Sequence, residues 1–194
     1  MSISLVAGLG NPGREYELSR HNLGWLALDA FASKHGLSWR DAPEFDSVVA
    51  RRDLGPGRTL WLAKPQTFVN GSGRAVAAIA RYHRIDPADV AAVYDDVTIE
   101  LGLLKVSVSG SDAGHNGVAS LLEHLGQGFA RLRLGIGPRQ PPEMDLKDFV
   151  LSRFTHDQLA IIQKKTDTYV QGLELLLASG PDRAMNQLNR RDIP

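Results

Sequence analysis

The sequence of 194 residues contains no cysteine, and its net charge is zero because 22 Lys and Arg residues balance 22 Asp and Glu residues. The absence of cysteine excludes disulfide bonds, thiol nucleophiles and cysteine-ligated metal centres, and it fits a reducing compartment. A chain without net charge does not hold nucleic acid by bulk electrostatics. A nucleic-acid partner would therefore need a local basic patch.

Long apolar runs are also missing. No run approaches the roughly 18 residues that span a bilayer, and no charged segment followed by an apolar one marks an export signal. We therefore expect no membrane partner and a cytoplasmic location. Repeats, low-complexity tracts and long linkers are absent too, so we expect residues 1–194 to form a single domain.

Apolar spacing predicts alternating strands and helices. Short apolar or alternating runs predict strands, and apolar residues three and four apart predict helices. The predicted strands are residues 3–9, 48–53, 59–63, 90–94, 103–109 and 132–136, and the predicted helices are residues 23–35, 72–83, 116–125 and 156–179 and a short one around 185–188. This order, with a hairpin at Gly55-Pro56-Gly57, predicts an α/β fold with a mixed sheet.

Several boundaries of these elements carry polar residues. Asn70 or Ser72 is expected to cap the second helix, and Asn116 the third. The strand over residues 90–94 is expected to end on Asp95-Asp96. Arg131 and Arg133 alternate with apolar residues, which predicts a half-exposed strand with both arginines on one face.

The stretch Gly8-x-Gly10-x-x-Gly13 follows the first strand and matches the dinucleotide-binding pattern. That pattern requires the glycines to open a helix directly and an acidic residue about 20 residues further on. Here Pro12 interrupts the pattern, helical spacing begins only near Leu23, and the nearest acid, Asp29, falls in the middle of a helix. A tight turn that presents Asn11 is the better interpretation.

His21 lies in Arg20-His21-Asn22, just before the apolar stripe of the first helix. Taken alone, a histidine there is more often a cap or a surface residue than a catalyst. Asp95 at the end of a strand could fix its tautomer, as catalysis requires. By its residues alone, however, Asp95-Asp96 is slightly better explained as a solvated pair between a strand and a turn.

The remaining polar candidates have ordinary explanations as well. Asn70 and Asn116 could be helix caps, and His115 could be a loop residue. No two histidines have a metal-ligand spacing such as H-E-x-x-H, so we expect no metal. The serines near glycines lack a G-x-S-x-G elbow, which disfavours a covalent serine mechanism.

Four segments together resemble the signatures of the bacterial peptidyl-tRNA hydrolase family, in order and at suitable spacing over nearly the whole chain. They are Gly8-Leu9-Gly10-Asn11-Pro12-Gly13-x-x-Tyr16 with Arg20-His21-Asn22-x-Gly24, Lys64-Pro65-Gln66-Thr67-Phe68-Val69-Asn70-x-Ser72-Gly73, Gly114-His115-Asn116-Gly117, and Phe129-x-Arg131-Leu132-Arg133-Leu134-Gly135-Ile136-Gly137.

The resemblance implies one twisted mixed β-sheet surrounded by helices, in a monomer that needs neither a metal nor another cofactor. The implied reaction is hydrolysis of the ester between a peptide and the 3′ ribose of tRNA, with the acceptor stem and 3′ end as the bound parts. The implied roles are catalysis for His21 and Asp95, substrate binding for Asn11, Tyr16, Asn70, His115 and Asn116, and tRNA binding for Lys105 and Arg133.

Some positions depart from the family pattern. Val69 stands where a Met is usual, Ser107 where some members have a second Lys, and Asp112 adds a negative charge near the path of the tRNA. Residues 31–84 contain nine basic residues and four acids, an excess that a tRNA footprint would explain. For Arg74 and Arg81, which share a helix face, we prefer the interpretation as a solvated face. The alternatives are a catalytically idle RNA-binding relative and an unrelated small hydrolase.

Overall fold

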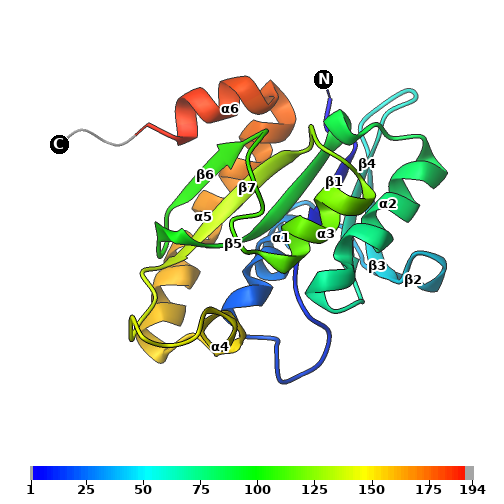
Figure 1. Ribbon diagram of the computed structural model, residues 1–194. Helices are drawn as coiled ribbons and strands as arrows, with labels where there is room; N and C mark the ends of the chain where they lie inside the picture. Colours follow the sequence, from blue (N-terminus) through cyan, green and yellow to red (C-terminus); the bar gives the residue numbers. More distant parts are fainter. Residues whose placement is uncertain (1, 191–194) are drawn as a thin grey trace.

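The computed structural model describes residues 2–190. Within them, the strands form one sheet of seven in the order β2-β3-β4-β1-β5-β7-β6, drawn in Figure 1. The strands are β1 (Leu5–Gly8), β2 (Arg40–Ala42), β3 (Ser47–Asp53), β4 (Thr59–Pro65), β5 (Val90–Glu100), β6 (Leu104–Ser107) and β7 (Ala130–Gly137).

Helices cover both faces of this sheet. Helices α1 and α5 lie on one face and α2 and α3 on the other, while α6 lies along β6 (Figure 1). The helices are α1 (Leu23–Lys34), α2 (Ser72–His83), α3 (Asn116–His124), α4 (Leu146–Leu151), α5 (His156–Ser179) and α6 (Pro181–Leu188), with short 3-10 turns η1 (Arg20–Asn22), η2 (Pro43–Phe45), η3 (Val69–Gly71) and η4 (Pro87–Asp89). The predicted single α/β domain is therefore what the described residues form.

The sheet is mixed, as predicted. The central strands β4, β1, β5 and β7 are parallel to one another, while β2, β3 and β6 add antiparallel edges. Because β1 and β5 have neighbours on both sides and helices on both faces, their apolar runs are buried throughout. Apolar spacing did not predict β2 and α4, which have three and six residues and too little periodicity to be recognised.

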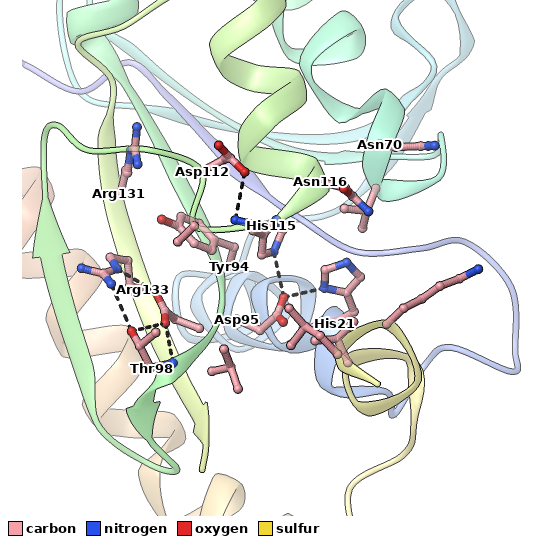
Figure 2. Close-up of a pocket in the computed structure, with 18 of the residues that line it drawn as sticks. His21, Asn70, Tyr94, Asp95, Thr98, Asp112, His115, Asn116, Arg131 and Arg133 are labelled. Carbon is pink, nitrogen blue, oxygen red and sulfur yellow. Dashed lines mark hydrogen bonds and ion pairs between the residues drawn. The ribbon is translucent and has the colours of Figure 1, made fainter. Parts of the chain in front are cut away.

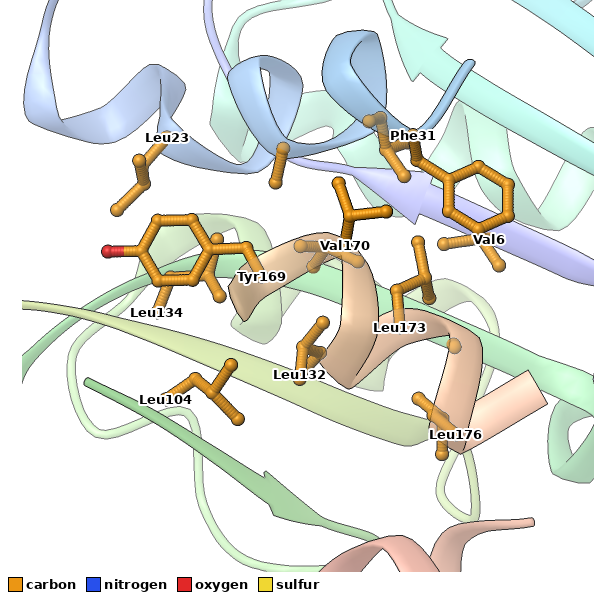
Figure 3. Close-up of a cluster of buried hydrophobic side chains, with 14 of the residues drawn as sticks. Val6, Leu23, Phe31, Leu104, Leu132, Leu134, Tyr169, Val170, Leu173 and Leu176 are labelled. Atoms are coloured by element: carbon orange, nitrogen blue, oxygen red, sulfur yellow. The ribbon is translucent and has the colours of Figure 1, made fainter. Parts of the chain in front are cut away.

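Two apolar clusters hold the helices to the sheet. The larger one joins α1 and α5 to β1 and β7, and it includes Tyr169, which is almost fully buried. Figure 3 shows Leu23 and Phe31 of α1 facing the side chains of α5 across this layer. The smaller cluster joins α2 and α3 to the opposite face. The two layers fix where the ends of β1 and β5 lie.

Helix boundaries confirm part of the predicted capping. Thr155 and Gln158 form the predicted capping box of α5, and Gly36 follows α1 with a φ of 63°. The predicted cap of α2 is wrong, because its N-cap is Gly71 and no side chain caps it. Asn70 instead lies in the preceding turn η3, where its side chain is exposed.

The strand predicted for residues 90–94 is longer than its apolar run. β5 continues to Glu100, with an irregularity in its pairing with β7 after Asp96. Asp95 and Asp96 therefore lie inside a strand and are buried, contrary to the prediction of a strand end. Among residues 2–190, no helix is both long enough and apolar enough to cross a bilayer.

We expect Gly73→Ala to destabilise the fold. Gly73 lies where α2 packs against α3, and a Cβ there would overlap the carbonyl oxygen of Ser120. Alanine favours a helix over glycine by about 1 kcal/mol, yet the overlap should outweigh this gain and lower the free energy of unfolding by at least about 2 kcal/mol. Urea denaturation measures the change.

The matched control is Arg74→Ala, one residue further along the same helix. Arg74 is exposed and pairs only with the exposed Asp46 at 3.3 Å, so its loss should change the free energy by less than about 0.5 kcal/mol. If Gly73→Ala were as mild as this control, the close approach of the two helices would not limit stability.

Candidate active site

A cavity of about 640 Å³ opens at the carboxyl ends of β1 and β5, which is where open α/β sheets place their ligands. Its walls come from the turn after β1, from η1 and η3, from the loop before α3 and from α4. Figure 2 shows that the side chains of His21, Asp95 and His115 converge in it. Segments far apart in the sequence thus contribute to one site.

The glycine-rich turn after β1 does not open a helix. It leads through residues 11–19 to η1, and α1 begins only at Leu23. Gly10 instead allows close packing, since a Cβ there would lie 2.9 Å from the ring of Trp25. Asp29 is bound to Lys64 at 2.6 Å. The structure therefore agrees with the rejection of the dinucleotide interpretation.

His21 and Asp95 form a buried pair. His21 Nδ1 lies 2.8 Å from Asp95 Oδ1, and the side chains are only 8% and 1% exposed. Burial by itself lowers the pKa of His21, but the charge of Asp95 and the hydrogen bond to it raise this pKa above its ordinary value of 6.5. Burial likewise raises the pKa of Asp95, and the two neighbouring imidazoles outweigh it and hold this pKa well below its usual range.

His115 is the second imidazole at Asp95. Its Nε2 lies 3.1 Å from the same carboxylate oxygen, while its Nδ1 accepts hydrogen bonds from the backbone N–H groups of Gly117 and Val118 at 3.1 and 3.3 Å. His115 therefore caps α3, and the prediction of Asn116 as its cap is wrong. Because Nδ1 accepts, the proton of the neutral ring lies on Nε2, which donates to Asp95.

The same reasoning determines the tautomer of His21. An ionised carboxylate only accepts hydrogen bonds, so His21 Nδ1 carries the proton that it shares with Asp95. In the neutral ring, Nε2 then holds the lone pair. His21 lines the cavity, and it is therefore equipped to take a proton from a molecule bound there.

Asn11 is held in one orientation by two other segments. Its Oδ1 accepts a hydrogen bond from the backbone N–H of Val69 at 2.8 Å, and its own backbone N–H and C=O bind the side chain of Asn22 at 2.8 and 2.9 Å. Because Val69 N–H can only donate, the oxygen of the Asn11 amide faces it and the NH₂ group is left for the cavity. This role of Asn22 was not predicted from the sequence.

The other predicted substrate-binding residues also line the cavity. Asn70 follows the buried Val69 in η3, and Asn116 begins α3; the side chains of both are exposed. Tyr16 lies on the turn before η1, and its ring meets that of Phe68 edge-on, with centroids 6.4 Å apart. Phe68 is 60% exposed. Amides and aromatic rings thus surround the His21 pair.

The predicted tRNA-binding residues lie on neighbouring strands at one side of the cavity. Lys105 on β6 pairs in register with Arg133 on β7, but only Arg133 lines the cavity. Arg133 Nε donates to Asp96 Oδ2 at 2.8 Å. Asp96 thereby holds the guanidinium against the wall, a contact that the sequence did not predict.

Arg131 differs from the prediction of an exposed residue. It is only 4% exposed, and its Nη1 and Nη2 atoms donate to the carbonyl oxygens of Ser111 and Gly110, each at 2.8 Å. Its charge is used to hold the loop before α3. The strand β7 is buried apart from Arg133. The loop before α3 covers the position of Arg131, which the alternation assigned to solvent.

Arg20 braces the turn that carries His21. Its buried guanidinium donates to Ser152 Oγ at 2.6 Å, to the carbonyl oxygen of Arg153 at 2.8 Å and to Gln158 Oε1 at 2.7 Å. The adjacent backbone of Ser19 also bridges to Arg153. The segment between α4 and α5, together with the first turn of α5, thus holds η1 in place.

The ligand atoms of His21, Asp95 and His115 lie within 4.8 Å of one another, close enough in principle to hold a metal ion. The hydrogen bonds account for this clustering in another way, because both imidazoles direct an N–H group at one carboxylate oxygen. A metal would have to replace both protons. The structure thus adds a metal candidate that the spacing of histidines in the sequence did not show.

Comparison with known proteins gives consistent matches. The model of the peptidyl-tRNA hydrolase family matches residues 5–194. A peptidyl-tRNA hydrolase of Gloeobacter violaceus is 42% identical over 192 residues, which are 98% of this chain and 96% of that protein. One of Desulfitobacterium hafniense is 41% identical over 97% of this chain and all of that protein. The crystal structure of peptidyl-tRNA hydrolase from Acinetobacter baumannii has a TM-score of 0.87 at 31% identity, covering 96% and 94% of the two chains.

The His21 pair predicts a particular titration. The ring signals of His21 in an NMR spectrum should titrate with a midpoint above 6.5, since Asp95 stabilises the imidazolium. Asp95→Asn should lower this midpoint, because burial then acts on the imidazolium without a compensating charge. Asp96→Asn is the matched control and should leave the midpoint nearly unchanged, as Asp96 binds Arg133 instead. A wild-type midpoint at or below 6.5 would contradict the paired geometry.

Proposed function

Because the chain belongs to the peptidyl-tRNA hydrolase family, we propose that it hydrolyses the ester bond between the peptide and the 3′ ribose of peptidyl-tRNA. The observation that carries this proposal is the buried His21–Asp95 pair, whose second ring nitrogen is available in a cavity that also holds the oriented amide of Asn11. An ester needs no covalent intermediate, since water and a general base suffice.

In the first step, His21 Nε2 takes a proton from a water molecule, and the water oxygen attacks the ester carbonyl carbon. Asp95 stabilises the imidazolium that forms. The tetrahedral intermediate then collapses: the bond to the ribose oxygen breaks, and the imidazolium returns its proton to that oxygen. The products are the free carboxyl group of the peptide and the free hydroxyl group of tRNA. General base catalysis of this kind typically contributes about 10²–10⁴-fold.

The NH₂ group of Asn11 is the proposed donor to the oxyanion. Its orientation is set before substrate binds, because Val69 N–H holds the amide oxygen. A donor oriented in advance at a developing negative charge contributes about 10²–10³-fold. In this proposal, the turn after β1 supplies the donor to the carbonyl oxygen of the substrate, and the turn η3 fixes the orientation of that donor.

The exposed amides of Asn70 and Asn116 and the ring of Tyr16 are proposed to bind the peptide and the 3′ end of the tRNA. Amide groups bond to the main chain of a peptide and ignore its side chains, which suits an enzyme that accepts many peptides. His115 is part of the same predicted set. Since both of its ring nitrogens are engaged, we assign it the positioning of Asp95 rather than direct contact with the peptide.

Lys105 and Arg133 are proposed to bind tRNA phosphate next to the acceptor end. The proposal is supported by their register on β6 and β7, which makes the two cationic residues neighbours, with Arg133 lining the cavity and Lys105 beside it. Phosphate contacts of this kind position the substrate and are sensitive to salt. We further propose a cytoplasmic monomer that works without a metal or another cofactor and binds no membrane.

A catalytically idle RNA-binding relative is the alternative. No feature of the site favours it, because a binding module would need neither a histidine with a set tautomer nor a buried carboxylate beside it. An unrelated small hydrolase is disfavoured by the family match over residues 5–194.

His21→Ala tests the general base. With EDTA present throughout, single-turnover hydrolysis of N-acetyl-aminoacyl-tRNA should be fast in the wild type and at least about 10³-fold slower in the variant, since the base is lost. Asp95→Asn should lose less, because the ring remains but its tautomer and orientation are no longer set.

The outcomes separate the hypotheses. Loss of wild-type hydrolysis in EDTA, with recovery on adding a divalent cation, would point to a metal at the His21, Asp95 and His115 group. Retained tRNA binding without any hydrolysis would favour the idle relative. Full activity of His21→Ala would keep the substrate class and contradict the mechanism.

Arg133→Ala tests the phosphate contact. We expect KM for peptidyl-tRNA to rise about tenfold with kcat within about twofold, because the residue holds the tRNA and does not touch the reacting ester. Arg133→Lys should restore part of the affinity, since it keeps a charge beside Asp96. Arg183→Ala on α6 is the control for loss of a surface charge. A fall in kcat without a rise in KM would contradict this role.

A further inference from the structure

A second cavity, of about 630 Å³, lies at the amino ends of the strands, at the other end of the sheet from His21. It is bordered by residues 2–4 before β1, by the hairpin between β3 and β4, and by the end of α2. In Figure 1 this hairpin and the N-terminus lie at one end of the molecule and α4, beside the active site, at the other. The proposed hydrolysis uses none of these residues.

Three arginines converge on this cavity from separate segments. Arg51 comes from β3, Arg58 from the hairpin and Arg84 from the end of α2, while the one acid in the lining is Asp89. Arg58 donates to Ser2 Oγ at 2.9 Å. Within residues 2–190, the guanidinium groups of Arg51 and Arg84 bind neither an acid nor a hydrogen-bond acceptor. The cavity therefore carries an excess of positive charge that is not neutralised internally.

The backbone of Arg84 is strained. It ends α2 with a φ of 55° and a ψ of 45°, the left-handed conformation that glycine and asparagine adopt most easily. Arginine is less favourable than glycine in this conformation, and Arg84 lines the cavity. Backbone outliers of this kind cluster at functional sites.

One wall of the cavity is aromatic. Trp61 pairs in register with Arg51 across β3 and β4, and its ring stacks on that of His83 with centroids 4.2 Å apart and an angle of 25°. Arg40 lies over Trp61 at 5.7 Å. Burial and the charge of Arg40 lower the pKa of His83, so its ring is neutral near pH 7 and acts as an aromatic surface.

We propose that this cavity binds a nucleotide, with its phosphate on Arg51 and Arg84 and its base against Trp61 and His83. Guanidinium groups bind phosphate through paired, charge-assisted hydrogen bonds, and aromatic rings bind bases by stacking with little sequence preference. The nucleotide can be free, or it can belong to a tRNA, in which case the inference rests on the proposed function.

The test compares two double variants. Arg51→Gln with Arg84→Gly removes both unpaired charges, and glycine suits the left-handed backbone, so the fold should be retained. Arg52→Gln with Arg81→Gln is the matched control, because Arg52 is the neighbour of Arg51 on β3 and Arg81 lies on α2, yet neither lines the cavity. AMP and inorganic phosphate are titrated separately while the indole N–H signals are followed by NMR.

We expect AMP to shift the Trp61 signal and to leave those of Trp25 and Trp39 in place. The cavity variant should bind AMP at least about tenfold more weakly than the control. If tRNA supplies the nucleotide, the cavity variant should bind deacylated tRNA more weakly than the control variant does. The slope of the logarithm of the binding constant against the logarithm of the salt concentration should then fall in magnitude by about 1 to 2. A loss confined to AMP identifies a free nucleotide, and a loss confined to tRNA identifies the RNA.

Two results would overturn the proposal. One is a cavity variant that equals the control with both AMP and tRNA. The other is that inorganic phosphate binds as tightly as AMP, so that the base contributes nothing, while the cavity variant binds tRNA as tightly as the control variant does. The value of kcat for N-acetyl-aminoacyl-tRNA should be the same in both double variants. If the wild type did not hydrolyse this substrate, the proposed function would be contradicted. The AMP titration would then still test whether the cavity binds a nucleotide.

Discussion

A single buried carboxylate oxygen organises the active site. Asp95 Oδ1 accepts hydrogen bonds from both His21 and His115 while its side chain is 1% exposed. Burying an ionised carboxylate is costly unless it is paired and fully hydrogen-bonded. Its position inside β5 and the two imidazoles together provide that pairing, so η1, the central strand and the start of α3 depend on one another.

This dependence also assigns different chemistry to two similar side chains. His21 has one nitrogen bound to Asp95 and one available, which suits it to the proposed role of general base. His115 has both nitrogens in use, because its Nδ1 caps α3. The two histidines thus differ because of their backbone positions: His21 lies in the turn before α1, and His115 caps α3. This difference supports the separate roles proposed for them.

The sequence predicted the fold class, the mixed sheet and the hairpin, because these depend on local apolar spacing and on glycine-rich turns. It could not predict that β5 extends through Asp95 and Asp96, since polar residues inside a strand are explained only by their partners across the sheet and in η1. The burial of Arg131 depends on the loop carbonyls of Gly110 and Ser111, which lie 20 residues or more away in sequence. The candidate site residues were predicted from the resemblance of the motifs to a known family. The contacts of Asn22 with Asn11 and of Asp96 with Arg133 became visible only in the structure.

The brace at Arg20 has a consequence for the order of biosynthesis. The turn that carries His21 is made early, yet its support comes from Ser152, Arg153 and Gln158, after four fifths of the 194 residues have been translated. A domain generally folds as a unit, so residues made early gain their tertiary contacts only when later residues are available. The turn η1 is therefore complete only after α4 and the start of α5 have been synthesised, and the position of His21 depends on one of the last parts of the chain to be made.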